Sequence, residues 1–69
     1  MRVIDPRKLL PAISPEGSTA EEVAAAYNAA AGEEQPLRMI VAGLHTLRHD
    51  GGVVMRVDRR RNVARWWVA

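Results

Sequence analysis

Cysteine is absent from this chain of 69 residues, and its absence excludes two common ways of stabilising a small domain. The chain can form neither a disulfide framework nor a zinc site with thiolate ligands, and its composition fits a reducing cytoplasm. No apolar run approaches the roughly 18 residues that a membrane span needs, and the N-terminus lacks the apolar core of a signal peptide. The sequence therefore predicts a soluble, cytoplasmic protein that does not bind a membrane.

Side-chain arrangements typical of an active site are also missing. The sequence shows no nucleophile paired with a base, no glycine-rich phosphate loop and no paired carboxylates in a credible cleft. His45 and His49 have the i, i+4 spacing of metal ligands on a helix, but Asp50 is the only candidate for a third ligand. We therefore predict that the protein is not an enzyme, binds no metal ion and no cofactor, and has no small-molecule substrate.

Basic residues are scarce in the first 37 residues, and acidic residues are scarce in the remainder. Residues 1–37 carry three Lys and Arg against six Asp and Glu, a net charge of 3 − 6 = −3, and residues 38–69 carry seven Arg against two Asp, or 7 − 2 = +5. A surface of one charge sign concentrates ions of the opposite sign, so the C-terminal half is predicted to bind a polyanion. The alternative is that the charges only keep a small domain soluble.

The N-terminal part of the chain predicts one short helix and one longer, alanine-rich helix. Asp5 is a good N-cap and Pro6 a good first helical residue, but Pro11 would break a long helix. The segment from Ser18 to Glu21 has the residues of a capping box. It predicts a helix that starts at about residue 19 and ends before the glycine at position 32.

The segment from 36 to 49 has the clearest helical pattern in the chain. Its apolar residues recur at i, i+3, i+4, i+7 and i+10 and form one stripe of a helix: Leu37, Ile40, Val41, Leu44 and Leu47. Pro36 suits the first helical position, and Asp50, Gly51 and Gly52 are residues that end a helix. The segment therefore predicts an amphipathic helix with one buried face.

Two strand-like runs, 53–57 and 63–68, follow this helix and predict a β-hairpin. We expect the register that places the apolar residues of both strands on one face of the hairpin. It pairs Val53 with Val68, Met55 with Trp66 and Val57 with Ala64. The loop then has four residues, 59–62, because a two-residue turn would force positive φ on two arginines.

This register separates two neighbouring tryptophans. Trp66 is predicted to lie in the core, and Trp67 is predicted to lie exposed on the outer face. There Trp67 could stack on a base or sugar or pack against a partner subunit, and we favour packing against a partner. Arg56 and Arg65 face each other on the same outer face. Two facing arginines repel each other unless an anion lies nearby.

This order of elements resembles the winged helix-turn-helix family. The resemblance rests on residues 36–53, with their proline, apolar stripe, glycine and valine, and on Arg59, Arg60 and Arg61 after them. They are similar to the recognition helix, glycine and wing of small bacterial and phage regulators, including the MarR-like group. The resemblance implies an α+β fold in a single domain over residues 1–69, with about three helices followed by a C-terminal β-hairpin wing.

The resemblance also implies a transcriptional regulator that binds double-stranded DNA, alone or as a homodimer. Its recognition helix (residues 36–49) would lie in the major groove, and its arginine-tipped wing (residues 59–62) would reach the DNA backbone or the minor groove. Arg38 is placed to donate to a guanine edge, and Ala42 and Thr46 to meet a thymine methyl group. The residues expected to contact DNA are Arg38, Met39, Ala42, His45, Thr46, His49, Arg56, Arg59, Arg60, Arg61, Asn62 and Arg65.

Two features leave alternatives open. Glu33 and Glu34 lie in the turn before the recognition helix, where carboxylates repel phosphate, although they also complement a helix dipole. The tip arginines alternatively serve to keep the hairpin from pairing with other strands. The alternative function is a winged-helix protein–protein interaction module in a larger bacterial or phage assembly, with the arginines bound to an acidic partner.

Overall fold

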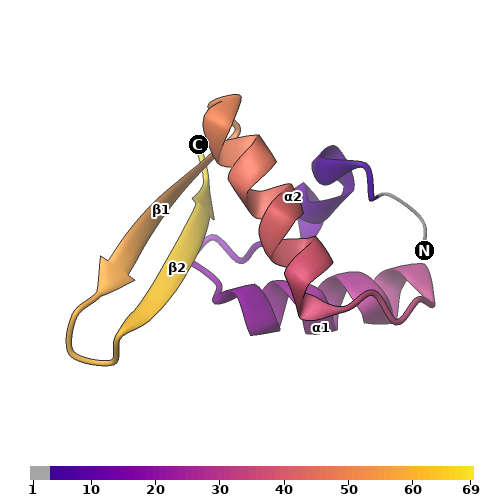
Figure 1. Ribbon diagram of the computed structural model, residues 1–69, viewed down its shortest axis with the longest axis horizontal. Helices are drawn as coiled ribbons and strands as arrows, with labels where there is room; N and C mark the ends of the chain where they lie inside the picture. The colour runs from indigo at the N-terminus through magenta and orange to yellow at the C-terminus, as the bar shows by residue number, and fades with distance from the viewer. Residues whose placement is uncertain (1–3) are drawn as a thin grey trace.

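The computed structural model describes residues 4–69 and shows a small α+β fold with three helices and a C-terminal hairpin. A 3₁₀ helix, η1 (Pro6–Ala12), precedes the α-helices α1 (Ala20–Ala31) and α2 (Leu37–His49), and the strands β1 (Val53–Asp58) and β2 (Val63–Val68) form one antiparallel sheet. The helices pack together on one side of the molecule, and the hairpin lies beside the end of α2 and extends away from them (Figure 1).

Both N-terminal helices have the kind of cap that their sequences predict. The side chain of Asp5 accepts a hydrogen bond from the backbone N–H of Arg7 (3.1 Å), and η1 is short, as its internal proline predicts. The capping box of α1, however, lies one residue later than predicted. Thr19 Oγ1 accepts from the Glu22 N–H (3.2 Å), and Glu22 Oε1 accepts from the Thr19 N–H (2.9 Å).

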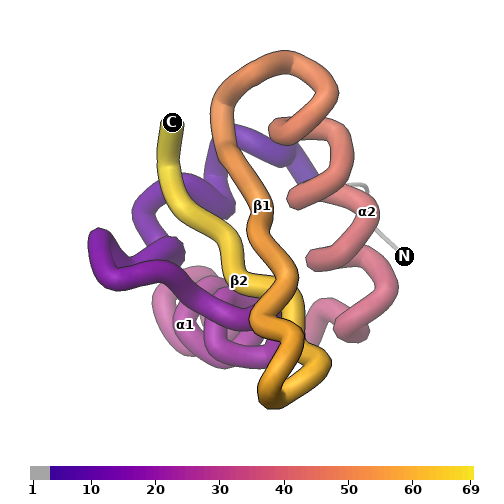
Figure 2. The backbone as a smooth tube through the Cα atoms, turned by 90° about the vertical axis from the view of Figure 1, so that its left-hand side faces the viewer, coloured from indigo at the N-terminus to yellow at the C-terminus, as the bar shows by residue number. Residues whose placement is uncertain are grey.

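Ser18 does not cap the helix because it pairs with the hairpin. Its N–H donates to the carbonyl of Trp66 (2.9 Å), and its carbonyl accepts from the N–H of Trp66 (2.8 Å). The Ser18 hydroxyl, in a side chain that is almost fully buried, accepts from the N–H of Ser14 (2.9 Å). This bridge, which the sequence did not reveal, ties β2 to the segment before α1; Figure 2 shows that segment running toward the strands.

The turn between α1 and α2 is held by one side chain of α1. Asn28 Oδ1 accepts from the N–H of Gln35 (2.9 Å), and Asn28 Nδ2 donates to the carbonyl of Gln35 (3.1 Å). Gly32 ends α1 in the left-handed conformation, with φ of 65°. These contacts hold the turn that leads from α1 into α2.

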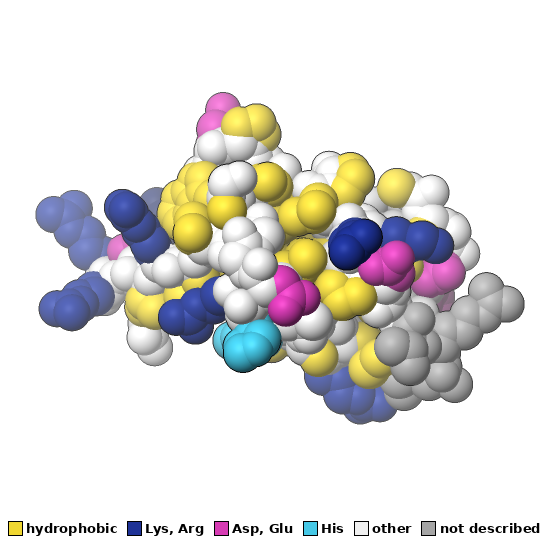
Figure 3. Space-filling model, turned by 90° about the horizontal axis from the view of Figure 1, so that it is seen from above, with side chains coloured by type: hydrophobic (Ala, Val, Ile, Leu, Met, Phe, Trp, Pro, Cys, Tyr) yellow, Lys and Arg dark blue, Asp and Glu magenta, His cyan; other side chains and the backbone are white. Residues whose placement is uncertain are grey.

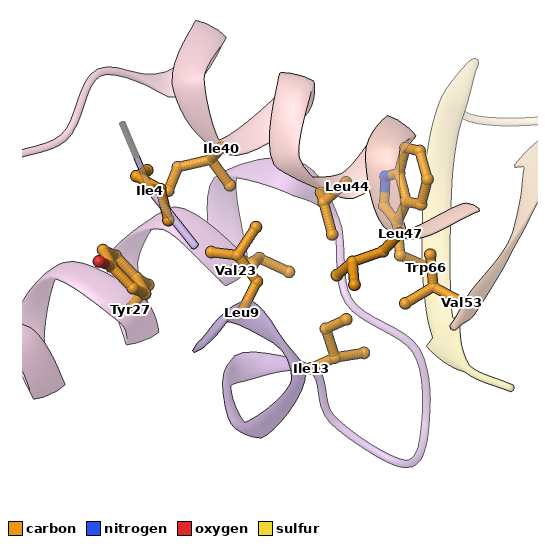
Figure 4. Packing of buried hydrophobic residues seen from close by; sticks show 10 residues of the cluster. All are labelled: Ile4, Leu9, Ile13, Val23, Tyr27, Ile40, Leu44, Leu47, Val53 and Trp66. Carbon is orange, nitrogen blue, oxygen red and sulfur yellow. The ribbon is translucent and has the colours of Figure 1, made fainter. Parts of the chain in front are cut away.

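The hydrophobic core contains residues from all three helices and both strands, as the close-up in Figure 4 shows. Its members are Ile4, Leu9, Ile13, Val23, Tyr27, Ile40, Leu44, Leu47, Val53 and Trp66. The predicted stripe of α2 is only partly right, because Leu37 is 42% exposed and Gly43 is buried instead. A Cβ atom on Gly43 would lie 2.7 Å from Leu9 Cδ1, so this glycine allows η1 to approach α2 closely.

The hairpin has the predicted register. Its pairs are Val53 with Val68, Val54 with Trp67, Met55 with Trp66, Arg56 with Arg65, Val57 with Ala64 and Asp58 with Val63. β1 is one residue longer than predicted, and the loop 59–62 has the predicted length, with Asn62 at φ 52°. Trp66 is 2% exposed, which confirms its placement in the core.

Candidate nucleic-acid interface

The outward face of α2 carries most of the side chains that the sequence assigns to base recognition. Arg38, Ala42, His45, Thr46 and His49 are all exposed. Met39 differs from the prediction, because it is half-buried and packs against the hydrophobic core. The helical wheel places Met39 opposite the apolar stripe, but in the structure it lines a depression together with Ile4 and Pro6.

One flank of this face lies against the N-terminal segment. Ala42, Gly43 and Thr46 line a shallow depression together with Ile4 and Pro6. Thr46 Oγ1 also donates a hydrogen bond to the carbonyl of Ala42 (3.0 Å), so its proton is engaged within the helix. The most accessible polar groups of the face are therefore those of Arg38 and the two histidines.

His45 connects α2 to the hairpin. Its ring meets the ring of Trp66 edge to face, with centroids 5.2 Å apart and an angle of 85° between the planes. This is a favourable aromatic geometry, and it holds one side of an otherwise exposed imidazole. His45 therefore packs on the hairpin while part of its ring remains available at the surface.

The hairpin tip presents three guanidinium groups to solvent. Arg59, Arg60 and Arg61 are exposed, and none of them lies within 4.0 Å of a carboxylate oxygen of residues 4–69. The side chain of Asp58 accepts from the backbone N–H of Arg60 (3.0 Å), and Asn62 takes the left-handed conformation that closes the loop. The loop backbone is thus fixed, and its cationic side chains have no acidic partner in the described part of the chain.

The two arginines that face each other across the hairpin have different surroundings. Arg65 is half-buried; its Nη1 donates to the carbonyl of Gly17 (3.2 Å) and lies 4.0 Å from Glu22 Oε1. Glu22 supplies an anion beside Arg65, and the hydrogen bond from the Thr19 N–H lowers the pKa of its carboxyl. Arg56 is exposed, so only Arg56 of the pair presents its side chain fully to a ligand.

Trp67 lies on the outer face of the hairpin, as predicted, but it is half-buried rather than exposed. Its indole covers Gly17: a Cβ atom at that position would lie 2.5 Å from Cε2 of the indole. Gly17 has φ of 91°, a conformation that favours glycine. The sequence shows this glycine only as part of a loop, and nothing in it links position 17 to the hairpin.

Of the two acidic residues in the turn before α2, one is held by its neighbours. Glu33 Oε2 accepts from the hydroxyl of Tyr27 (3.2 Å) and from Nε2 of Gln35 (3.2 Å). Burial, and then the Glu33 charge, raise the pKa of the Tyr27 hydroxyl above its ordinary value of 10.0. Glu33 thus stabilises the turn, and Glu34 is the exposed carboxylate.

Charge is distributed over the surface as it is along the sequence. In Figure 3, Lys and Arg side chains gather at the hairpin end, whereas in the other half of the molecule some of them lie next to Asp and Glu. Within residues 4–69, no three His, Cys, Asp or Glu side chains are grouped as metal ligands. None of the helices in that part of the chain has the length and apolar character to cross a membrane.

Comparisons of the chain with protein-family models, curated proteins and solved structures found no match.

Proposed function

We propose that this chain binds double-stranded DNA as a winged helix-turn-helix protein and acts as a transcriptional regulator. The observation that carries the proposal is the hairpin tip, where three exposed arginines lack an acidic partner among residues 4–69. Exposed guanidinium groups without internal partners suit phosphate oxygens, which accept two parallel hydrogen bonds from one arginine. The element order, three helices and then a hairpin, is compatible with a winged-helix arrangement.

In this proposal α2 lies in the major groove. An α-helix fits that groove, and within residues 4–69 most side chains on the outward face of α2 are exposed. Arg38, in the first turn, donates to a guanine edge, and Ala42 meets a thymine methyl group. His49 and the accessible part of His45 contact bases or phosphates.

The hairpin tip then acts as the wing, with Arg59, Arg60 and Arg61 on the backbone or in the minor groove. Arg56 follows them along the outer face of β1. Arg65 is the residue whose expected role changes most. Its bond to the Gly17 carbonyl makes it an anchor for the hairpin rather than a direct contact to DNA.

A selection experiment followed by binding measurements tests this assignment. A preferred duplex is selected from a random pool, and its affinity is compared with that of random duplex by fluorescence anisotropy. Arg38→Ala should weaken binding to the selected duplex by about 1–3 kcal/mol and weaken random binding much less. Lys8→Ala is the matched control, because Lys8 is an exposed cation of η1 that lines a pocket with Ala26 and Ala30 of α1 and belongs to neither α2 nor the hairpin.

Two outcomes of this experiment contradict parts of the proposal. If Arg38→Ala weakens both duplexes equally, Arg38 contacts phosphate and α2 does not read guanine through it. If the unmodified protein binds no duplex at low salt, DNA is not the partner. The alternative of a protein–protein interaction module then takes precedence.

A further inference from the structure

The β2 edge of the hairpin pairs with the segment before α1 at Trp66, whereas the β1 edge makes no such pairing within residues 4–69. Ala69 N–H donates to the Gly52 carbonyl (3.0 Å), which identifies residues 52 and 69 as a hydrogen-bonded pair of the ladder. Such pairs alternate along antiparallel strands, so Trp66 directs its N–H and C=O away from β1. Ser18 binds both groups of Trp66, as this alternation requires.

The same alternation fixes which groups of β1 point away from β2. Val53, Met55 and Val57 direct their N–H and C=O to the outer edge of β1. Val53 is buried beside α2, but Val57 is 55% exposed, and Figure 1 shows β1 diverging from α2 toward the loop. Within residues 4–69, neither Met55 nor Val57 makes a backbone hydrogen bond outside the hairpin. The outer edge is therefore unpaired at the end of β1 nearest the loop.

We propose that this edge binds an extended, acidic segment of a partner protein, which adds to the sheet as a further strand. The proposal does not rest on DNA binding. Residues 56–61 hold four arginines and one aspartate, a net charge of +3, and this charge lies at the end of the unpaired edge. A second copy of this chain would bring two such edges of equal charge together, which disfavours self-pairing. An acidic segment gains both the backbone hydrogen bonds and the charge complementarity.

The two faces of the hairpin specify the side chains of the added strand. Successive residues of a strand point to opposite faces. On the outer face, Arg56 lies in the middle of the open edge. On the inner face, which carries Trp66, Val57 is exposed. The segment that fits therefore alternates acidic residues, beside Arg56, with apolar residues, beside Val57 and Met55.

A synthetic peptide of alternating valine and glutamate, labelled with fluorescein, tests the proposal on the full chain. Val57→Pro removes an N–H that points outward and takes no part in the hairpin ladder, and proline is tolerated at such positions in edge strands. Val57→Ala is the matched control, because it shortens the side chain and keeps the N–H. Val57→Pro should bind the peptide about tenfold more weakly than Val57→Ala. The amides of Met55 and Val57 in the unmodified protein should become protected from hydrogen exchange when the peptide binds.

A second version of the peptide makes the test independent of how the proline variant folds. Methylation of alternate backbone nitrogens, on the edge that faces β1, removes the donors and leaves every charge in place. The methylated peptide should bind about tenfold more weakly to the unmodified protein. Equal binding of both peptides would mean ion pairing without strand addition and would overturn the proposal, as would a dimer of the unliganded protein that protects the same amides. Duplex DNA binding should be unchanged in Val57→Pro, which separates this proposal from the one above.

Discussion

Replacing Gly17 by alanine should destabilise the fold in a way that can be separated into two causes. Gly17 has φ of 91°, and the hairpin closes over it through the indole of Trp67. An alanine Cβ would lie 2.5 Å from Cε2, 2.6 Å from Cζ2 and 2.9 Å from Nε1 of that indole. The indole is rigid, so the hairpin or the loop must move to relieve the contact.

Gly32→Ala is a control, because Gly32 also has a positive φ but an added Cβ atom there would meet no neighbouring atom. Its φ is 65°, and a Cβ atom there has no neighbour within 4 Å. Gly32→Ala should therefore cost only the left-handed conformation of an L-residue, about 1–2 kcal/mol. Gly17→Ala should cost a similar amount plus about 1–3 kcal/mol for the overpacked indole.

Urea unfolding followed by circular dichroism measures the difference. For a chain of this size, the free energy of unfolding falls by about 1 kcal/mol for each molar of urea. The additional cost therefore places the urea midpoint of Gly17→Ala about 1–3 M below that of Gly32→Ala. Gly17→Ala in combination with Trp67→Ala should recover part of the loss, because the contact is removed. Equal midpoints for the two single variants would show that the indole does not cover Gly17, and the account of how the hairpin is anchored would fail.

Three further changes test the fold around the site. Trp66→Ala should cost about 3–5 kcal/mol in urea unfolding, because the side chain is 2% exposed and its loss leaves a cavity between α2 and the hairpin. Asn28→Ala should cost about 1–3 kcal/mol in the same assay, since it removes both hydrogen bonds to the Gln35 backbone. Glu22 stabilises the fold above its ordinary pKa of 4.5, because the Thr19 N–H lowers its pKa in the folded state, and this contribution is lost as the pH falls. Glu22→Gln should therefore make the free energy of unfolding depend less on pH in the acidic range. An unchanged dependence on pH would contradict this role of Glu22.

The sequence predicts the hairpin better than any other part of the fold. Its register follows from the requirement that apolar residues of both strands share a face, and the arginine-rich loop excludes a tight turn. Both constraints are local, so they can be applied without knowing what the hairpin packs against. The helix α2 is also predicted from local information, because its apolar residues recur with the period of a helix in the sequence.

The errors arise where tertiary contacts decide the outcome. The capping box is displaced because Ser18 pairs with Trp66, a residue distant in the sequence. Leu37 belongs to the apolar stripe but lies at the start of α2 and is 42% exposed, and Gly43 is buried because Leu9 of η1 packs on it. Helical periodicity shows which residues share a face, but it does not show where the neighbouring elements end.

The candidate site is predictable in its charge and less so in its contacts. Exposure of the three tip arginines follows from their place in a hairpin loop. The engagement of Arg65 with Gly17 does not, because the two residues meet only when the loop before α1 reaches the hairpin. Strand register assigns a side chain to a face, and only the packing on that face shows whether it is available to a ligand.

The salt dependence of DNA binding tests the central claim most directly. The affinity of the unmodified protein for a random duplex is measured from low to moderate salt, and the measurement is repeated after Arg59, Arg60 and Arg61 are all replaced by alanine. Each phosphate contact that is lost should reduce the slope of log affinity against log salt by about 0.9, so three lost contacts reduce it by about 2.7. The account predicts weaker binding with this flatter slope in a variant that remains folded, because the three side chains are exposed. An unchanged affinity and slope would show that the hairpin tip does not bind DNA.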